Sequence, residues 1–222
     1  MYLEQSEREN DVGNAASGGA DQKRRQIIDG ARRVFLAAGF DGASMGEIAK
    51  AAGVSKGTLY SYFTSKEALF ERLILDERTG LAEALFRLNS EDPDTRAVLR
   101  QLGRSFLEMV VRPEHISSVR MVIGVAEKLP QIGQVFYDAG PCQGARRLAA
   151  YLDRQVAAGR LVIPDTAVAA VQFLDLCAGP VMKRLLFSVD PVPDRPMLER
   201  QVESAITVFF AAYSASPASA QA

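Results

Sequence analysis

Residues 44–70 read SMGEIAKAAGVSKGTLYSYFTSKEALF, and this stretch decides the fold. Ser44 followed three residues later by Glu47 is the capping-box pattern that begins a helix. Gly53 supplies the positive φ that a tight turn between two helices requires, and Ser55 can then serve as the N-cap of a second short helix. Two short helices joined by such a turn predict a helix-turn-helix, which lays its second helix in the major groove of double-stranded DNA.

A longer amphipathic helix is expected before this stretch, over residues 23–38, with Gly39 placed to end it. Its apolar positions are Ile27, Ile28, Ala31, Val34, Phe35 and Ala38. In the second short helix, Leu59 and Phe63 share one face and are expected to pack on this longer helix. The three helices together predict a DNA-binding domain over residues 22–69.

Charge is distributed unevenly along the chain, although the net charge is only −1. Residues 1–21 carry five acids and one arginine, whereas residues 22–66 carry eight basic side chains and three acids. A basic segment suits a polyanion, because each neutralised phosphate releases counterions. A solvated helix surface is the alternative, and the coincidence with the motif favours DNA. Residues 1–21 are predicted to form a disordered acidic arm.

Composition and cysteine usage exclude several classes of protein. The chain is 48% hydrophobic and 24% charged and has no run of eighteen apolar residues, so we expect a cytoplasmic protein with no membrane partner. Cys142 and Cys177 lie far apart without metal-ligand spacing, and neither a metal nor a cofactor is predicted. With one histidine and no recognisable catalytic constellation, the sequence predicts no catalytic residue.

Residues 70–213 predict a larger body of amphipathic helices, so the fold class is all-α, with a three-helix head on a helical body. Helices are expected at 66–88, 95–111, 115–128, 132–158, 165–187 and 197–213. Kinks are predicted at Pro141 and Pro180, because proline removes a backbone donor. Residues 214–222 are predicted to be a disordered tail.

The segment VSKGTLYSYFTSKEALF, residues 54–70, resembles the helix-turn-helix signature of the TetR/AcrR family of bacterial transcriptional regulators. The resemblance extends back through ASMGEIAKAAG to the first helix, and beyond Phe70 it is only architectural. The family implies a homodimer, usually a repressor, that releases its operator when a small-molecule effector enters the body. A non-specific architectural DNA protein is the alternative, and the modest charge of the head disfavours it.

The resemblance also implies which residues contact DNA. The matching positions are Ser44, Lys56, Gly57, Thr58, Tyr60, Ser61, Tyr62 and Lys66. Thr58 and Tyr60 are expected at base edges or adjacent phosphates, and the flank position of Tyr60 favours a mixed role. Gly57 costs about 1 kcal/mol of helix stability relative to alanine, which favours a partner that approaches the backbone. Lys66 opposes the dipole of its own helix. A phosphate partner would explain it, and a solvated lysine is the alternative.

The last two predicted helices are apolar on more than one face, which favours a symmetric dimer interface. Such a dimer would place two heads about 34 Å apart on a palindromic site. Their apolar residues are Val168, Val171, Leu174, Leu176, Val181, Leu185, Leu186, Val202, Ile206, Val208, Phe209 and Phe210.

Residues on the middle helices are candidates for an effector pocket that takes an uncharged or weakly charged apolar ligand. They are Phe106, Met109, Met121, Phe136, Tyr137, Phe173, Cys177 and Met182. For each residue taken alone, ordinary core packing is the alternative. His115 has no metal-ligand neighbours and is predicted to be a surface histidine.

Overall fold

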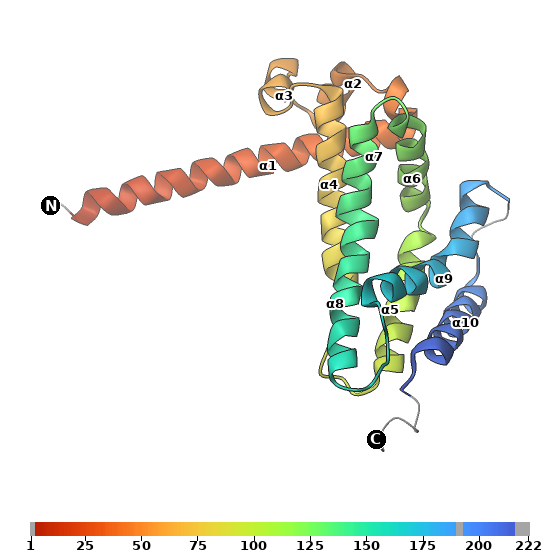
Figure 1. The fold of residues 1–222 in the computed structure, drawn as a ribbon. Helices are drawn as coiled ribbons and strands as arrows, with labels where there is room; N and C mark the ends of the chain where they lie inside the picture. The colour runs from red at the N-terminus through yellow and green to blue at the C-terminus, as the bar shows by residue number, and fades with distance from the viewer. Residues whose placement is uncertain (1–2, 190–192, 216–222) are drawn as a thin grey trace. The chain divides into compact units, whose positions relative to one another are not determined.

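The computed structural model describes residues 3–189 and 193–215, which are helical apart from short turns and one isolated bridge (Figure 1). The predicted all-α fold class is confirmed. The helices are α1 (Leu3–Gly42), α2 (Met45–Ala52), α3 (Lys56–Tyr62), α4 (Lys66–Leu85), α5 (Thr95–Val110), α6 (Pro113–Ala126), α7 (Pro130–Tyr137), the π-helical segment η1 (Asp138–Cys142), α8 (Gln143–Ala157), α9 (Thr166–Leu186) and α10 (Arg195–Tyr213). None of the helices in the described ranges is long and apolar enough to cross a membrane.

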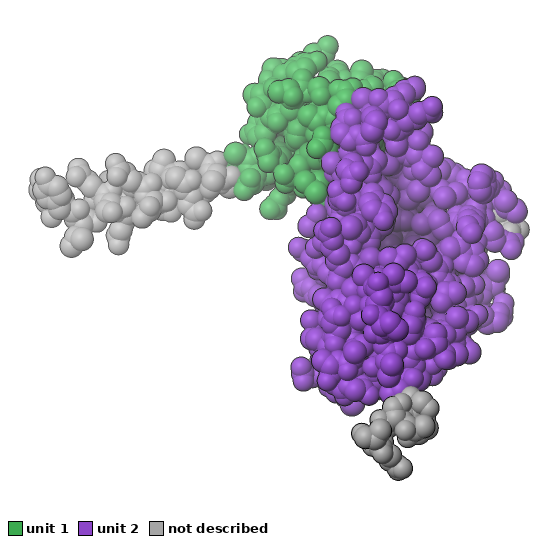
Figure 2. All heavy atoms as spheres, viewed as in Figure 1, with its two compact units in different colours: residues 1–76 green, residues 77–222 purple. Residues whose placement is uncertain are grey.

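The chain forms two compact units, residues 1–76 and 77–222 (Figure 2). The DNA-binding domain was predicted to end at residue 69, but the units divide later, inside α4. The reason is that the first half of α4 belongs to the core of unit 1, where Leu69, Phe70, Leu73 and Ile74 are all buried.

Helix α1 differs most from its prediction, because it begins at Leu3 where a disordered arm was expected. No proline occurs before Pro93, so nothing covalent prevents the helix from continuing through residues 3–21. Gly39 adopts φ 71° and ψ 176°, which kinks α1 instead of ending it. Two residues predicted for its buried face are not buried: Val34 is half-buried and Ala38 is exposed.

Unit 1 has a core in which α1, α2, α3 and the first half of α4 meet. Leu59 and Phe63 are buried as predicted. The Phe70 ring centroid lies 4.8 Å from that of Phe35 and 5.1 Å from that of Phe40, so an aromatic cluster joins α4 to the end of α1.

Gly30 sets the distance between α1 and α2. A Cβ added at Gly30 would lie 2.6 Å from the Ala52 Cβ and 2.7 Å from its backbone nitrogen. No side chain fits there, so these two helices approach as closely as only glycine allows.

Unit 2 has its core among α5, α8, α9 and α10. Phe173 of α9 packs edge-on against Phe209 of α10, with ring centroids 5.4 Å apart. Gly103 of α5 allows a close approach to α10, since a Cβ there would lie 3.0 Å from Val202 Cγ1. A buried polar contact, Thr95 Oγ1 donating to Gln155 Oε1 at 3.0 Å, ties α5 to α8.

The predicted interruption near Pro141 is present as the π-helical segment η1, which contains that proline and separates α7 from α8. Pro180 lies inside α9, which continues past it to Leu186. The predicted tail begins with two described residues. Ser214 forms a bridge with Leu161, and the residues from 216 onward lie outside the described part.

Candidate functional site

The turn between α2 and α3 is built as the sequence predicts. Ser44 Oγ accepts a hydrogen bond from the Glu47 N–H at 3.2 Å, and the Ser44 N–H donates to the Glu47 carboxylate at 3.0 Å. Gly53 adopts φ 64°, and the Val54 N–H donates to the Ala49 carbonyl at 3.0 Å. The helix is therefore capped at both ends, which fixes the direction in which α3 leaves the turn.

Two side chains of α1 hold the end of α2. Gln26 Nε2 donates to the Ala52 carbonyl at 2.6 Å, and the Arg33 guanidinium donates to the Ala51 carbonyl. These carbonyls are among the last in α2 and have no partner within the helix. The two contacts therefore fix α2, and with it the turn, against α1.

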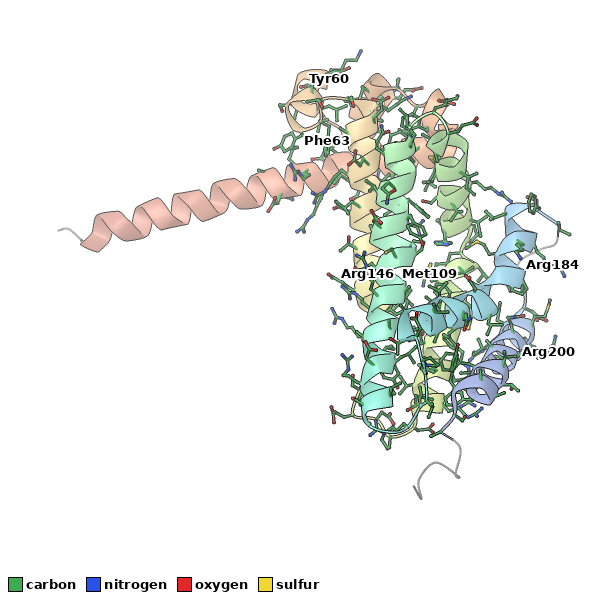
Figure 3. All side chains as sticks on the ribbon, in the orientation of Figure 1. Tyr60, Phe63, Met109, Arg146, Arg184 and Arg200 are labelled. Atoms are coloured by element: carbon green, nitrogen blue, oxygen red, sulfur yellow. The ribbon has the colours of Figure 1, made fainter. Side chains whose placement is uncertain are left out.

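Helix α3 buries one face and exposes the other. Leu59 is fully buried, whereas Tyr60 is 52% exposed. Figure 3 shows Tyr60 projecting outward from α3, while the Phe63 ring centroid lies 6.0 Å from Arg24 Cζ of α1. Among the predicted DNA contacts, Ser44, Lys56, Gly57, Tyr60 and Ser61 are exposed, and Thr58, Tyr62 and Lys66 are half-buried. The structure thus brings the α3 candidates to one short helix with an outward face.

The serine and threonine hydroxyls at this helix already have partners. Ser55 Oγ accepts from the Thr58 N–H at 3.0 Å and lies 2.9 Å from Thr58 Oγ1. Ser61 Oγ donates to the Thr58 carbonyl at 2.7 Å. These bonds hold the Ser55, Thr58 and Ser61 side chains against the backbone of α3, whereas the Tyr60 side chain is exposed.

Gly57 lies on the exposed face of α3, and packing within the protein does not require a glycine there. A Cβ at this position would meet only Ser55 Oγ, at the ordinary contact distance of 3.8 Å. Alanine would therefore fit and would favour the helix by about 1 kcal/mol. The contrast with Gly30 is direct, since Gly30 has no room for a side chain.

Lys66 has partners within unit 1 in addition to the phosphate or solvent expected for it. Its ammonium donates to the carbonyls of Phe40 at 2.8 Å and Ala43 at 3.1 Å, and it lies 4.4 Å from the centroid of the Phe40 ring. These contacts explain a lysine in the first turn of α4 without a phosphate. Its ammonium satisfies the carbonyl of Phe40 in the last turn of α1 and the carbonyl of Ala43 just before α2. A lysine ammonium has three donors, and these bonds use two.

The eight pocket candidates are not brought together as one group. Phe106, Met109, Phe173, Cys177 and Met182 lie in or against the unit 2 core. Burial raises the pKa of the Cys177 thiol to about 12, so this cysteine is an inert core residue. Tyr137 is 58% exposed, so it lies at the surface and outside the unit 2 core. Met121 and Phe136 are half-buried.

A buried basic site in unit 2 was not predicted. Arg78 of α4 is only 5% exposed, and its guanidinium lies 4.0 Å from the Phe136 ring centroid. Arg78 Nη1 lies 3.0 Å from His115 Nδ1, and Nη2 donates to Ser118 Oγ at 3.3 Å. Arg78 Nε is buried and has no hydrogen-bond partner among the described residues.

His115 is a member of this site, so the prediction of a surface histidine is wrong. Burial, and then the charge of Arg78, lower the pKa of His115 to about 4. A neutral imidazole can accept at Nδ1, and the arginine supplies the donor. Burial also lowers the pKa of Arg78 to about 10, against the opposing effect of Glu77, so the guanidinium remains charged at neutral pH.

One sequence signal could have revealed the site. Phe70, Ile74 and Arg78 are spaced four residues apart, which places an arginine on the buried stripe of α4. His115 and Ser118, three residues apart, share a face of α6. Among the described residues, no group of His, Cys, Asp and Glu could hold a metal ion.

Comparisons with known proteins cover both units. Residues 27–73 match the family described as bacterial regulatory proteins, tetR family, and residues 97–215 match the AefR-like transcriptional repressor C-terminal domain. The HTH-type transcriptional repressor Rv1474c of Mycobacterium tuberculosis is 28% identical over 76% of this chain and 85% of its own length. The HTH-type transcriptional regulator AcrR of Shigella flexneri is 35% identical over 43% of this chain, a match that spans 45% of that relative.

Two solved structures are similar over most of their length. The Flavonoid-responsive Regulator FrrA is 34% identical with a TM-score of 0.73, covering 87% of this chain and 98% of FrrA. A TetR-family transcriptional regulator from Mesorhizobium loti MAFF303099 is 28% identical with a TM-score of 0.83 and the same coverage.

Proposed function

We propose that this chain, which belongs to the TetR family of bacterial transcriptional regulators, represses transcription by binding a palindromic operator as a homodimer and releases it when a small, mainly apolar molecule binds unit 2. It is a regulator and not an enzyme. The observation that carries the proposal is the outward face of α3, a short helix fixed by caps on both sides of its turn. Its DNA partner implies a cytoplasmic protein.

The head contacts follow from this geometry. Tyr60 is the most exposed aromatic side chain of the reading helix, which supports a contact with a base edge or phosphate. Gly57 lets the DNA backbone approach the start of α3. Ser44 marks the N-terminus of α2, where free N–H groups and the positive end of the helix dipole favour a phosphate. Thr58, Ser61, Tyr62 and Lys56 complete the proposed surface, and the third donor of Lys66 is available to a phosphate.

Exposed apolar residues on the last two helices support the homodimer. Val168 and Val171 of α9 are 49% and 46% exposed, and Val208 of α10 is 50% exposed. Ser204 and Ala211, on the same side of α10 as Val208, are small and exposed, which permits close helix packing. Not all apolar residues predicted for the interface are available to it. Six of them are buried within unit 2: Leu174, Val181, Leu185, Val202, Ile206 and Phe209.

Helix α4 supports coupling between effector and operator, since one continuous helix carries residues of both units. An effector shifts the equilibrium only by its different affinities for two conformations, and a preference of about 100-fold corresponds to about 2.7 kcal/mol. The names of Rv1474c, a repressor, and FrrA, a flavonoid-responsive regulator, support repression and a small-molecule response.

The test is a selection of bound duplexes from a random pool, followed by binding measurements on the purified full chain. We expect an enriched palindrome and a dimer in sedimentation. Thr58→Val and Tyr60→Phe should each weaken binding to the selected duplex by about 1–3 kcal/mol if they read bases, with little change on random duplex. Glu108→Gln, an exposed change in unit 2, is the control. A monomer that ignores palindromic DNA at low ionic strength would refute the proposal.

A further inference from the structure

We infer that Arg78 receives an anionic group of the effector, and that the molecule sensed by this protein is therefore a mainly apolar monocarboxylic acid. The inference rests on the proposed effector response and names the chemical class of the ligand. It is carried by a nearly fully buried guanidinium with one donor unused and an aromatic ring beside it.

Burial of the charged Arg78 guanidinium costs free energy. A charged side chain is taken out of water only at a considerable penalty, which good hydrogen bonds must offset. The hydrogen bonds of Arg78 go to His115 and Ser118, an imidazole kept neutral and a hydroxyl. Neutral acceptors offset less of the penalty than a carboxylate does. A buried arginine bonded in this way is a site prepared for an anion.

The unused donor lies on one edge of the Arg78 guanidinium. Arg78 Nε–H has no partner among the described residues, and Nη2 has two N–H donors but one hydrogen bond, to Ser118 at 3.3 Å. Nε and one Nη form the parallel pair of donors that a carboxylate accepts side-on. Nη1 is occupied by His115, which holds the far side of the guanidinium. The free edge therefore matches the two oxygens of one carboxylate.

Neighbouring elements position the Arg78 side chain. A Cβ at Gly140 would lie 3.2 Å from Arg78 Cδ, so the π-helical segment makes room for the arginine stem. Such segments occur frequently at functional sites. The Phe136 ring fixes the plane of the guanidinium. Met121 follows Ser118 by three residues on the same face of α6, where it can meet the apolar part of a ligand.

The alternative is that Arg78 is only a structural link between α4, α6 and α7. Both roles predict a folded protein with a buried arginine. They differ in one respect: a structural link has no reason to distinguish a carboxylate from an uncharged group of the same shape.

The experiment uses straight-chain carboxylates of six to twelve carbons and a set of aromatic carboxylates, each paired with its primary amide. Affinity for the full-length protein is measured by calorimetry and by the shift in melting temperature. Amides keep the shape and apolar area of the acid and lack its charge. For at least one pair, we expect the wild-type protein to bind the acid about ten-fold more tightly or better, as charge-assisted bidentate bonds allow.

Variants then assign this preference to one residue. Arg78→Met should bind acid and amide equally, while Arg146→Met, which removes an exposed arginine of α8 (Figure 3), should keep the wild-type preference. Arg78→Lys retains a cation without the side-on pair of donors and should show an intermediate ratio. Circular dichroism melts confirm that each variant is folded.

The outcomes separate this inference from the proposed function. If no acid in the set is preferred over its amide, or if Arg78→Met keeps the preference, the anion site is wrong. Operator binding is measured on the same samples. A protein that binds its operator without any acid preference loses only this inference, whereas failure to bind any duplex refutes the regulator itself.

Discussion

Helix α4 contributes a half-buried lysine, Lys66, to unit 1 and a buried arginine, Arg78, to unit 2, and the two are satisfied in different ways. In unit 1, the Lys66 ammonium has two backbone carbonyls within 3.1 Å and an aromatic ring beneath it. In unit 2, Arg78 is more deeply buried, its hydrogen bonds go to the neutral side chains of His115 and Ser118 although the charge of Glu77 also acts on it, and it keeps a donor unused. The difference indicates that the Lys66 ammonium is satisfied by backbone carbonyls of unit 1, whereas the Arg78 guanidinium in unit 2 keeps a donor that its described neighbours leave without a partner.

The largest effect is expected where unit 1 is most tightly packed. Gly30→Ala places a Cβ within 2.7 Å of the Ala52 backbone, which cannot yield as a flexible side chain would. We expect a loss of about 3 kcal/mol in the free energy of unfolding, measured with urea. Gly124→Ala in α6 is the matched control, since nothing lies within 4 Å of its added Cβ. Equal effects of the two substitutions would show that the α1–α2 contact is not tight.

The helix-turn-helix was predictable because its signals are local. Ser44, Glu47, Gly53 and Ser55 each act on backbone groups a few residues away, and all four have the predicted roles. The body helices were likewise predictable in kind from periodicity, within a few residues at their ends.

The buried basic site was not predictable in the same way, because its members come from three helices. Nothing near Arg78 in sequence indicates that His115 and Phe136 meet it, and an isolated histidine read as exposed. The pocket candidates could not be separated from core residues for a related reason. An aromatic or methionine at helical spacing fits a core and a cavity equally well, and only the packing of α9 on α5 and α10 decides between them for Phe173 and Cys177.

The second prediction is a loss of folding stability as the pH falls, caused by His115 beside Arg78 in unit 2. The pKa of His115 is about 4 in the folded protein and about 6.5 when unfolded, so the unfolded state binds the extra proton first as pH falls. The stabilising contribution of neutral His115 to the free energy of unfolding is therefore fully present above pH 6.5, and it is lost as the pH falls from 6.5 to 4. The loss should amount to roughly 2–3 kcal/mol. Protonation would also set His115 against the charge of Arg78 and remove its acceptor.

The measurement compares urea unfolding of the wild-type protein and His115→Gln at several pH values from 7 to 4.5. Glutamine keeps a neutral acceptor that does not titrate in this range. The difference between the two proteins isolates His115 from the carboxylates, which titrate in both. Parallel pH profiles would mean that His115 is as accessible to protons in the folded chain as in the unfolded one.

The third prediction compares the two basic residues directly. Lys66→Met removes two hydrogen bonds to carbonyls of buried residues, and the free energy of unfolding should fall by about 1–2 kcal/mol. Arg78→Met removes a costly buried charge and should be neutral or stabilising. Both changes place methionine on the same helix, so each controls for the other. A larger loss at Arg78 than at Lys66 would reverse the comparison drawn between the units.

The smallest stability effect is expected at Gly57, where it should oppose the effect on binding. Gly57→Ala meets only Ser55 Oγ at 3.8 Å, so the free energy of unfolding should rise by up to about 1 kcal/mol. Operator affinity should nevertheless fall, because the added methyl group stands on the exposed face proposed to meet DNA. Gly80→Ala, in α4 with nothing within 4 Å of its Cβ, controls for helix propensity alone. If Gly57→Ala stabilises the fold and leaves operator affinity intact, the DNA does not approach the start of α3, and Tyr60 must reach it from another direction.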